Sequence, residues 1–277
     1  DIAGQSDRYQ TIAFAPLNYY YLGLNFDRDI FKIPEFRKAL SLAIDRKRVR
    51  SDTYLNQCDS ATGPFPNASN YWNWKVPQDP YDATQAKTLL RSLKDKGITD
   101  NDGNGMFEFK GNPIKLRLLF PLESGSLYKS YENVCNIISG SFRNIGIEVM
   151  LEHYPNAQWR DSVYRKRSFD MAFGKWIFGD IYANPAEMFV TGGKYNYIKY
   201  SNTEVDSLFS QFQKEVNSDK RKDTGKAIHK KIANERPYIF LWTLKQVSAY
   251  DVRRLSNVGI NPYNYFDNIY EWGVVKK

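Results

Sequence analysis

The chain has 277 residues, of which 42% are hydrophobic and 16% aromatic, enough to build the core of one large domain or two ordinary ones. Lysine and arginine total 39 against 31 acidic residues, giving a net charge of +8, yet the basic residues are scattered and no nucleic-acid-binding module occurs, so we expect no nucleic-acid partner. With two histidines and no CxxC or HExxH spacing, we also expect no metal site and no cofactor.

The sequence contains no run of about 18 apolar residues that would span a membrane. It opens with DIAGQSDRYQ, which has neither an initiator methionine nor an apolar signal core. We therefore expect that the chain was processed or belongs to a larger protein. Cys58 and Cys135 lie far apart in the sequence and fit either one disulfide or two buried thiols.

In chain order, the first element is a strand over residues 19–26, where YYYLGLNF is rich in aromatic residues. A helix follows over residues 34–49, with Pro34 in its first turn and apolar residues at helical spacing on one face. Residues 56–80 contain four prolines together with Trp72 and Trp74 and show neither helical nor strand periodicity. Long aperiodic loops inside a domain are often functional, so we expect this loop to face a ligand.

The middle of the chain predicts a strand, a helix and a second strand. Asp82 and Gln85 form a capping pair for a helix that Gly97 ends, and Gly111-Asn112 is expected to turn a hairpin. Strands are expected around residues 114–120 and 147–151, with a helix over 126–144 between them. Such a βαβ unit implies parallel pairing, so the fold class is predicted to be α/β.

The last third predicts a short helix over 156–166, a buried strand over 169–173, helices over 203–216 and 220–235, and a strand over 238–242. His229 lies among lysines on the second of these helices, which predicts a solvated histidine. From Tyr250 onward the sequence is aromatic and rich in turns, without a core pattern of its own.

Residues 100–108, DNDGNGMFE, resemble a calcium-binding loop because Asp100, Asp102 and Asn104 alternate before a glycine. The twelfth position of such a loop, where a bidentate glutamate is expected, is occupied by Gly111. Calcium is therefore the weaker alternative, and a tight turn closed by Asx side chains is the prediction.

No catalytic constellation is evident. The sequence lacks a GxSxG elbow and a glycine-rich phosphate loop. Asp180 and Glu187 could form a carboxylate pair that acts on a sugar, but two acids near one loop are common by chance. We expect that the protein is not an enzyme.

The aromatic content is the unusual feature, because 20 tyrosines and 6 tryptophans exceed what a core needs when each polar tip requires a partner. They concentrate in two loops, residues 65–74 and 173–189. This concentration indicates a ligand-binding surface, and the alternative is that the two loops pack on one another.

Several strings in this order resemble the extracytoplasmic solute-binding proteins of oligopeptide and dipeptide ABC importers (family 5 type). They are YYYLGLNF, FRKALSLAIDRKRV, PYDATQAKTLL, GITDNDGNGMFEFKGNPIKLRLLFP, NYIKYSNTEVDSLF with ERPYIFLW, and NPYNYFDNIYEW. The resemblance implies a periplasmic-binding-protein-like (type II) lobe with a mixed β-sheet flanked by helices. By this resemblance residues 1–18 are a crossover from a missing first lobe, 19–245 the second lobe and 246–277 a return segment.

The resemblance also implies a ligand site. In the family, a tryptophan is followed after a short spacer by an aspartate that pairs with the α-ammonium of a peptide, which would make Trp176 a cleft residue and Asp180 the amine anchor. Three residues separate these two, where the family has two, and alignment on Pro185 would instead place Ile181 at the anchor. Trp159 matches another pocket aromatic, and three further residues complete the expected set: Phe178, Tyr182 and Asn184.

The implied partners are a peptide ligand, the permease subunits of an ABC importer in the membrane, and the missing N-terminal lobe of the same protein. The implied location is extracytoplasmic, in the periplasm or as a membrane-anchored lipoprotein. The alternatives are another solute of the same fold, namely a nickel complex, sugar, opine or heme, or a carbohydrate-active enzyme, which would need two carboxylates about 5–10 Å apart in a cleft.

Overall fold

A six-stranded mixed sheet forms the centre of the protein. The computed structural model describes residues 7–14, 17–122, 126–260 and 266–275. The sheet has the order β3-β10-β2-β9-β7-β8, in which β7 pairs in parallel with β8 and β9 and the other pairs are antiparallel. Its strands are β2 (Asn18–Leu24), β3 (Cys58–Ser60), β7 (Lys115–Leu122), β8 (Glu148–Pro155), β9 (Met171–Ile177) and β10 (Tyr238–Leu244).

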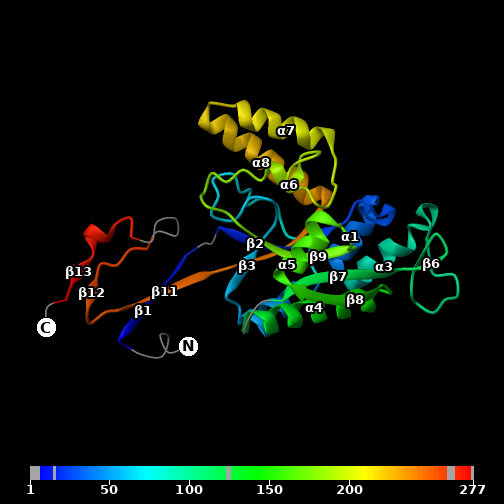
Figure 1. Ribbon diagram of the computed structural model, residues 1–277, viewed down its shortest axis with the longest axis horizontal. Coiled ribbons are helices and arrows are strands. Elements are labelled where there is room, and N and C mark those ends of the chain that lie inside the picture. The colour runs from blue at the N-terminus through cyan, green and yellow to red at the C-terminus, as the bar shows by residue number, and fades with distance from the viewer. Residues whose placement is uncertain (1–6, 15–16, 123–125, 261–265, 276–277) are drawn as a thin grey trace.

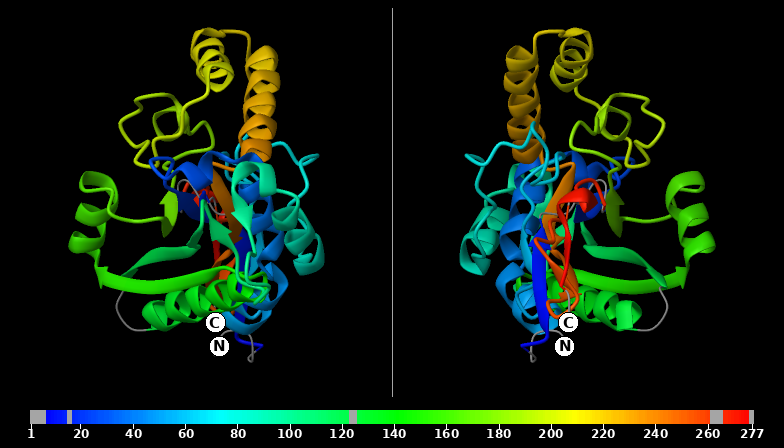
Figure 2. Two further views of the ribbon diagram at one scale, coloured as in Figure 1. Left: turned by 90° about the vertical axis from the view of Figure 1, so that its right-hand side faces the viewer. Right: turned by 90° about the vertical axis from the view of Figure 1, so that its left-hand side faces the viewer.

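Helices cover both faces of this sheet (Figures 1 and 2). One face carries α1 (Pro34–Ala43), α2 (Arg46–Tyr54), α3 (Ala83–Arg91) and α4 (Ser126–Asn144). The other face carries α5 (Asn156–Arg160), α6 (Ala186–Phe189), α7 (Thr203–Lys214) and α8 (Ser218–Glu235). The predicted α/β class, with a mixed sheet flanked by helices, is confirmed.

Strand β2 places large apolar side chains on both faces of the sheet. Successive side chains of a strand point to opposite faces. Tyr20, Leu22 and Leu24 accordingly enter the core beneath α1 and α4, whereas Tyr19 and Tyr21 enter the core on the other face. All five side chains are buried, because both faces of the sheet are covered where this strand lies.

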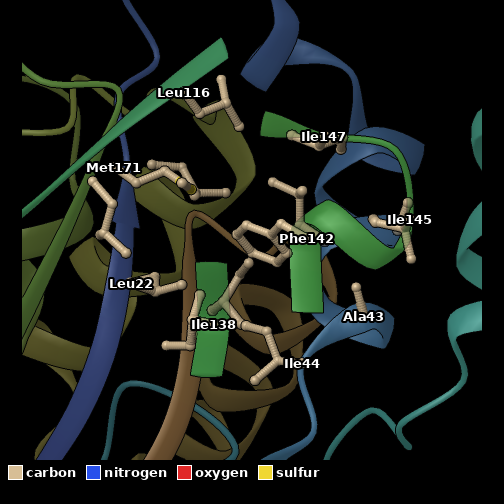
Figure 3. Close-up of a cluster of buried hydrophobic side chains, with 14 of the residues drawn as sticks. Leu22, Ala43, Ile44, Leu116, Ile138, Phe142, Ile145, Ile147 and Met171 are labelled. Carbon is tan, nitrogen blue, oxygen red and sulfur yellow. The ribbon is translucent and has the colours of Figure 1, made fainter. Parts of the chain in front are cut away.

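The core on the α4 face is packed from three strands and the long helix. Figure 3 shows Leu22, Leu116 and Met171 gathered with Ile138 and Phe142 of α4. The same core buries both cysteines, Cys58 and Cys135, as free thiols. Of the two alternatives for the cysteines, the structure therefore has two buried thiols.

The helix predicted over residues 34–49 is broken into two, so that prediction is wrong in its extent. Helix α1 ends at Ala43 and α2 begins at Arg46. Between them, the side chain of Asp45 accepts a hydrogen bond from the backbone N–H of Arg48 at 2.9 Å. Aspartate in this role caps a new helix. The apolar spacing continues across Asp45, so it does not show that the helix is broken there.

The small hairpin turns one residue earlier than predicted. Strands β5 (Glu108–Phe109) and β6 (Asn112–Pro113) pair Phe109 with Asn112, so the turn residues are Lys110 and Gly111. Their φ angles are +52° and +80°, as a two-residue type I′ turn requires. Strand β4 (Ile98–Thr99) completes this three-stranded sheet.

The predicted cap of α3 is confirmed, because Asp82 accepts the N–H of Gln85 at 2.7 Å.

Strands near the two ends of the chain form a separate ribbon. Strand β1 (Tyr9–Phe14) pairs antiparallel with β11 (Gln246–Asp251), and together they run away from the α/β body (Figure 1). Beyond them, β12 (Leu255–Ser256) pairs with β13 (Gly273–Val274). Among the described residues from 247 onward, none is buried, which agrees with the absence of a core pattern there.

His229 is fully buried, so the prediction of a solvated histidine is wrong. Its ring is 0% exposed, lies 3.0 Å from the Thr62 hydroxyl through Nε2 and stacks against Phe65. A Cβ at Gly63 would approach the ring to 2.6 Å. Burial lowers the pKa of His229 to about 3. The lysines around it in the sequence occupy other faces of α8.

We expect the protein to lose stability in acid through His229. Its pKa falls from 6.5 to about 3 on folding, so the unfolded chain binds the extra proton and stability decreases as the pH falls below about 6.5. The expected loss is about 2 kcal/mol between pH 7 and 5. Urea unfolding of the protein and of His229→Gln at both pH values measures it. An equal pH dependence in the variant would contradict this assignment.

Candidate functional site

A pocket of about 620 Å³ lies where three parallel strands end. Strands β7, β8 and β9 all run in the same direction, and the pocket is formed by the ends of β7 and β9 together with the segment that follows β8. Open α/β sheets bind ligands outside the carboxyl ends of their parallel strands. The lining residues are Pro121, Tyr131, Asn156, Ala157, Trp159, Arg160, Tyr164, Gly174, Lys175, Trp176 and Ile177.

Aromatic rings in fixed orientations form the wall of this pocket. Trp176 stacks on Tyr21 with an interplanar angle of 7°, and Tyr164 meets the Trp176 ring edge-on at 87°. Trp159 in turn contacts Tyr164 edge-on, with ring centroids 6.0 Å apart. Interlocked rings of this kind are preorganised, so a ligand that packs on them loses little free energy in ordering the site.

Gly174 on β9 makes room for the ring beneath the wall. A Cβ at this position would lie 2.9 Å from the Tyr21 hydroxyl oxygen. That hydroxyl accepts a hydrogen bond from Tyr197 at 3.0 Å, and the Tyr21 ring stacks on Tyr238 at 4.1 Å. Burial raises the pKa of the Tyr21 and Tyr197 phenols well above the usual value. The layer under the pocket is therefore aromatic and uncharged.

The pocket brings together two of the residues expected to bind the ligand. Trp176 at the end of β9 and Trp159 on α5 both line it. Asp180 follows in the loop after β9, where it is exposed and is not among the lining residues. One of its carboxylate oxygens accepts the backbone N–H of Tyr182 at 2.6 Å, which leaves the other oxygen for a further partner.

The other three expected residues lie apart from the lining of this pocket. Phe178 is half-buried and packs against Tyr19 in the core. Tyr182 is 61% exposed and its ring lies near Tyr71 of the earlier aromatic loop. Asn184 accepts the N–H of Ala186 at 3.0 Å at the start of α6.

The two aromatic loops are in contact, as the alternative interpretation of their composition predicted. Besides the ring contact between Tyr71 and Tyr182, the Ser69 hydroxyl donates to the Ile181 carbonyl at 3.0 Å. Phe65 and Tyr71 are buried in the core, and Trp74 is 69% exposed. Much of the aromatic content of residues 65–74 therefore serves packing.

Several residues that line the pocket were not predicted from the sequence to bind a ligand, among them Tyr131, Arg160, Tyr164 and Lys175. They come from α4, from the helix after β8 and from β9, so no local pattern joins them. The available signal was positional, because residues that follow the predicted parallel strands meet at one edge of the sheet.

The candidate calcium loop uses its side-chain oxygens internally. Asp100 accepts the N–H of Gly105, Asp102 accepts the N–H of Asn104, and Asn104 accepts the N–H of Met106. These bonds form the Asx-closed turn that was predicted. Within the described residues, no cluster of three or more histidine, cysteine or acidic side chains is arranged to hold a metal ion.

None of the helices that the structure describes combines the length and the apolar composition that crossing a bilayer requires. Among the described residues that line the aromatic pocket, none is an aspartate or a glutamate, the residues whose carboxylates glycoside hydrolysis uses in pairs.

Comparison with known proteins identifies relatives over nearly the whole chain. The model of the family described as bacterial extracellular solute-binding proteins, family 5 Middle, matches residues 2–197. The oligopeptide-binding protein AppA of Bacillus subtilis is 24% identical over 94% of this chain and 47% of its own length. Heme-binding protein A of Haemophilus influenzae is 24% identical over 80% of this chain and 39% of its own length.

The fold is shared with solved structures. The structure of AppA from Bacillus subtilis in complex with a nonapeptide superposes with a TM-score of 0.81 at 23% identity, covering 99% of this chain and 54% of that one. The chain thus spans about half the length of the relatives that it matches.

Proposed function

Because this chain belongs to the bacterial extracellular solute-binding proteins of family 5, we propose that it forms one ligand-binding lobe of the receptor of an ABC importer and that the solute is a peptide. The observation that carries the proposal is the pocket of interlocked rings at the carboxyl ends of β7, β8 and β9. Rings enclose peptide side chains of many kinds without requiring a particular one. Relatives described as oligopeptide-binding and peptide-bound support this choice of solute.

We propose that residues 19–245 are the lobe and that residues 1–18 and 246–277 cross toward a second lobe. The paired strands β1 and β11 support this division, because they leave the α/β body side by side. An ion pair between Arg8 and Asp251 at 2.8 Å joins them. Two strands that connect two lobes are suited to a hinge, since small backbone rotations in both strands move one lobe relative to the other.

Within the site, Trp176 and Trp159 are proposed to pack on the ligand, and Asp180 is proposed to bind its α-ammonium group. A carboxylate that pairs with a cationic end group in a closed cleft forms a charge-assisted hydrogen bond. Phe178, Tyr182 and Asn184 would flank this anchor in the same loop. The protein would act without catalysis and without a cofactor.

The proposed cellular setting is extracytoplasmic, in the periplasm or on a lipid anchor, with transfer of the ligand to permease subunits in the membrane. The family description as extracellular supports the compartment.

Calorimetric titration of peptide pools into the full-length protein that carries this chain tests the proposal. We expect saturable binding of peptides and none of a nickel chelate, heme or an oligosaccharide. Binding of one of these three solutes without any binding of peptide would reject the peptide assignment and leave the family membership intact.

A further inference from the structure

A second pocket, of about 190 Å³, lies in another part of the α/β body and contains two arginines. It forms where the end of α1, the start of α2 and the end of α8 meet at β10. It shares no lining residue with the aromatic pocket. Among the described residues that line it, the charged ones are Arg46, Arg236 and Asp79. Two positive charges therefore face one negative charge.

Arg46 is buried without a carboxylate partner. It is 5% exposed, and burial lowers the pKa of its guanidinium to about 10, so it is charged at neutral pH. It donates to the carbonyl and the hydroxyl of Ser41 at 2.8 and 2.9 Å, and over the longer distances of 3.3 and 3.5 Å to the carbonyls of Phe240 and Asp79. In the described part of the chain no acidic side chain lies within ion-pair distance of it. A buried charge without a counter-charge is unfavourable, and an anion in the pocket would compensate it.

The carboxylate that lines the pocket is committed to the other arginine. Both oxygens of Asp79 accept from Arg236, one from Nε at 2.7 Å and the other from Nη2 at 2.8 Å. Burial opposes the ionisation of Asp79, yet the bonds from Arg236 hold its pKa below the usual value, so it carries a full negative charge. Glu235, beside Arg236 in the sequence, pairs instead with Arg37 and Lys231. Neither acid therefore neutralises Arg46.

A third arginine adds to the positive potential at Arg46. Arg236 and Arg50 repel its charge, and Asp79 attracts it. Arg50 donates to the Ser60 hydroxyl at 3.2 Å and has no acidic partner among the residues that the structure describes. A concave site with an excess of one sign of charge concentrates the electrostatic potential. In addition, Nη2 of Arg46 makes only one of the bonds above, so its second N–H is available to a ligand.

We propose that this pocket binds a small oxyanion of the phosphate or sulfate type, that Arg46 and Arg236 hold it, and that the bound anion stabilises the protein. Guanidinium groups match oxyanions because several N–H groups can donate to several oxygens at once. The volume of about 190 Å³ is smaller than the pockets that enclose drug-sized ligands, which suits an inorganic ion. A phosphate group of a larger molecule presents the same chemistry.

Calorimetric titration of the full-length protein in a chloride buffer free of oxyanions tests this site. Inorganic phosphate, sulfate and glycerol 3-phosphate are the three probes. We expect saturable binding of inorganic phosphate and sulfate, and a melting temperature that rises with either ion and levels off as the site fills. Both ions also stabilise proteins in general through exclusion from the surface, but that effect does not saturate. Tighter binding of glycerol 3-phosphate would identify a phosphate ester as the ligand of the same site.

Variants assign the anion to the two arginines. Arg236→Gln should weaken phosphate binding about 10- to 100-fold, and Arg236→Lys, which keeps the charge but loses the paired hydrogen bonds, should weaken it about 10-fold. Asp79→Asn removes the negative charge and should strengthen binding about 10-fold. Arg48→Gln is the matched control, because it removes an exposed charge from α2 outside this pocket, and it should leave the affinity unchanged.

Far-UV circular dichroism establishes that each variant is folded, and Arg236→Lys and Asp79→Asn serve if Arg236→Gln does not fold. Opposite changes in affinity for the arginine and the aspartate variants support the site, since a purely structural role of this ion pair would not produce them. Absence of saturable binding, or equal affinity in the wild type and in the folded variants of Arg236 and Asp79, overturns the inference. The titration uses no peptide, so its failure would leave the proposed function untouched.

Discussion

Replacing Trp242 by alanine is expected to lower the free energy of unfolding by about 3–5 kcal/mol, the range for deleting a buried tryptophan side chain from a packed core. Trp242 is 0% exposed. It stacks on Tyr20 with ring centroids 5.7 Å apart and also contacts Tyr54 and Phe173. The cavity left by the indole would be surrounded by rings of a sheet and a helix that cannot collapse into it without moving.

Trp74→Ala is the matched control, because this tryptophan is 69% exposed and the Lys75 ammonium lies 5.5 Å from the centre of its ring. Its expected effect lies within about 0.5 kcal/mol of zero. Urea unfolding of both variants, followed by circular dichroism rather than by tryptophan fluorescence, gives the two values. Similar losses in both variants would show that Trp242 is not the packing centre that its contacts indicate.

The second large effect is expected for Asp180→Asn, which should weaken peptide binding about 10- to 100-fold if Asp180 holds the ligand ammonium group. Asparagine keeps the oxygen that accepts the N–H of Tyr182, so the turn after β9 should be retained. The change then removes only the negative charge. Calorimetric titration measures the loss, with a peptide that the wild-type full-length protein binds added to each of the two proteins.

Acetylating the amino group of the same peptide completes a thermodynamic cycle. In the wild-type protein acetylation should cost as much as the substitution does, and in Asp180→Asn it should cost nothing further, because the two changes remove the same interaction. Additive losses would mean that Asp180 acts elsewhere. Its position outside the residues that line the aromatic pocket makes this cycle the decisive measurement for the anchor.

The sequence predicted most elements of the fold because their signals are local. The alternation of Ile114, Leu116 and Leu118 predicted a strand, and these side chains are buried in β7 or, for Ile114, directly before it. The periodicity of residues 126–144 predicted α4, and the glycine at 146 with φ of +87° ends it. Where the prediction was wrong, as at Asp45 and Lys110, one hydrogen bond or one pair of backbone angles decided the outcome.

The candidate site was predictable only in part. Trp176 and Trp159 were identified through the family resemblance, and both line the pocket. Arg160, Tyr164 and Lys175 were not, because they become neighbours only when the ends of β7 and β9 and the segment after β8 meet. The order of strands in the sheet, β3-β10-β2-β9-β7-β8, has no local signature in the chain.

By itself, the sequence determined the α/β class, the succession of strands and helices, and the aromatic character of the chain, since periodicity, capping and composition act over a few residues. The tertiary structure alone decided which polar and aromatic groups are buried. It enclosed His229 despite the lysines beside it, and it placed Arg160 at the pocket. Burial and electrostatic surroundings depend on segments that are distant in the chain, so short-range patterns carry no information about them.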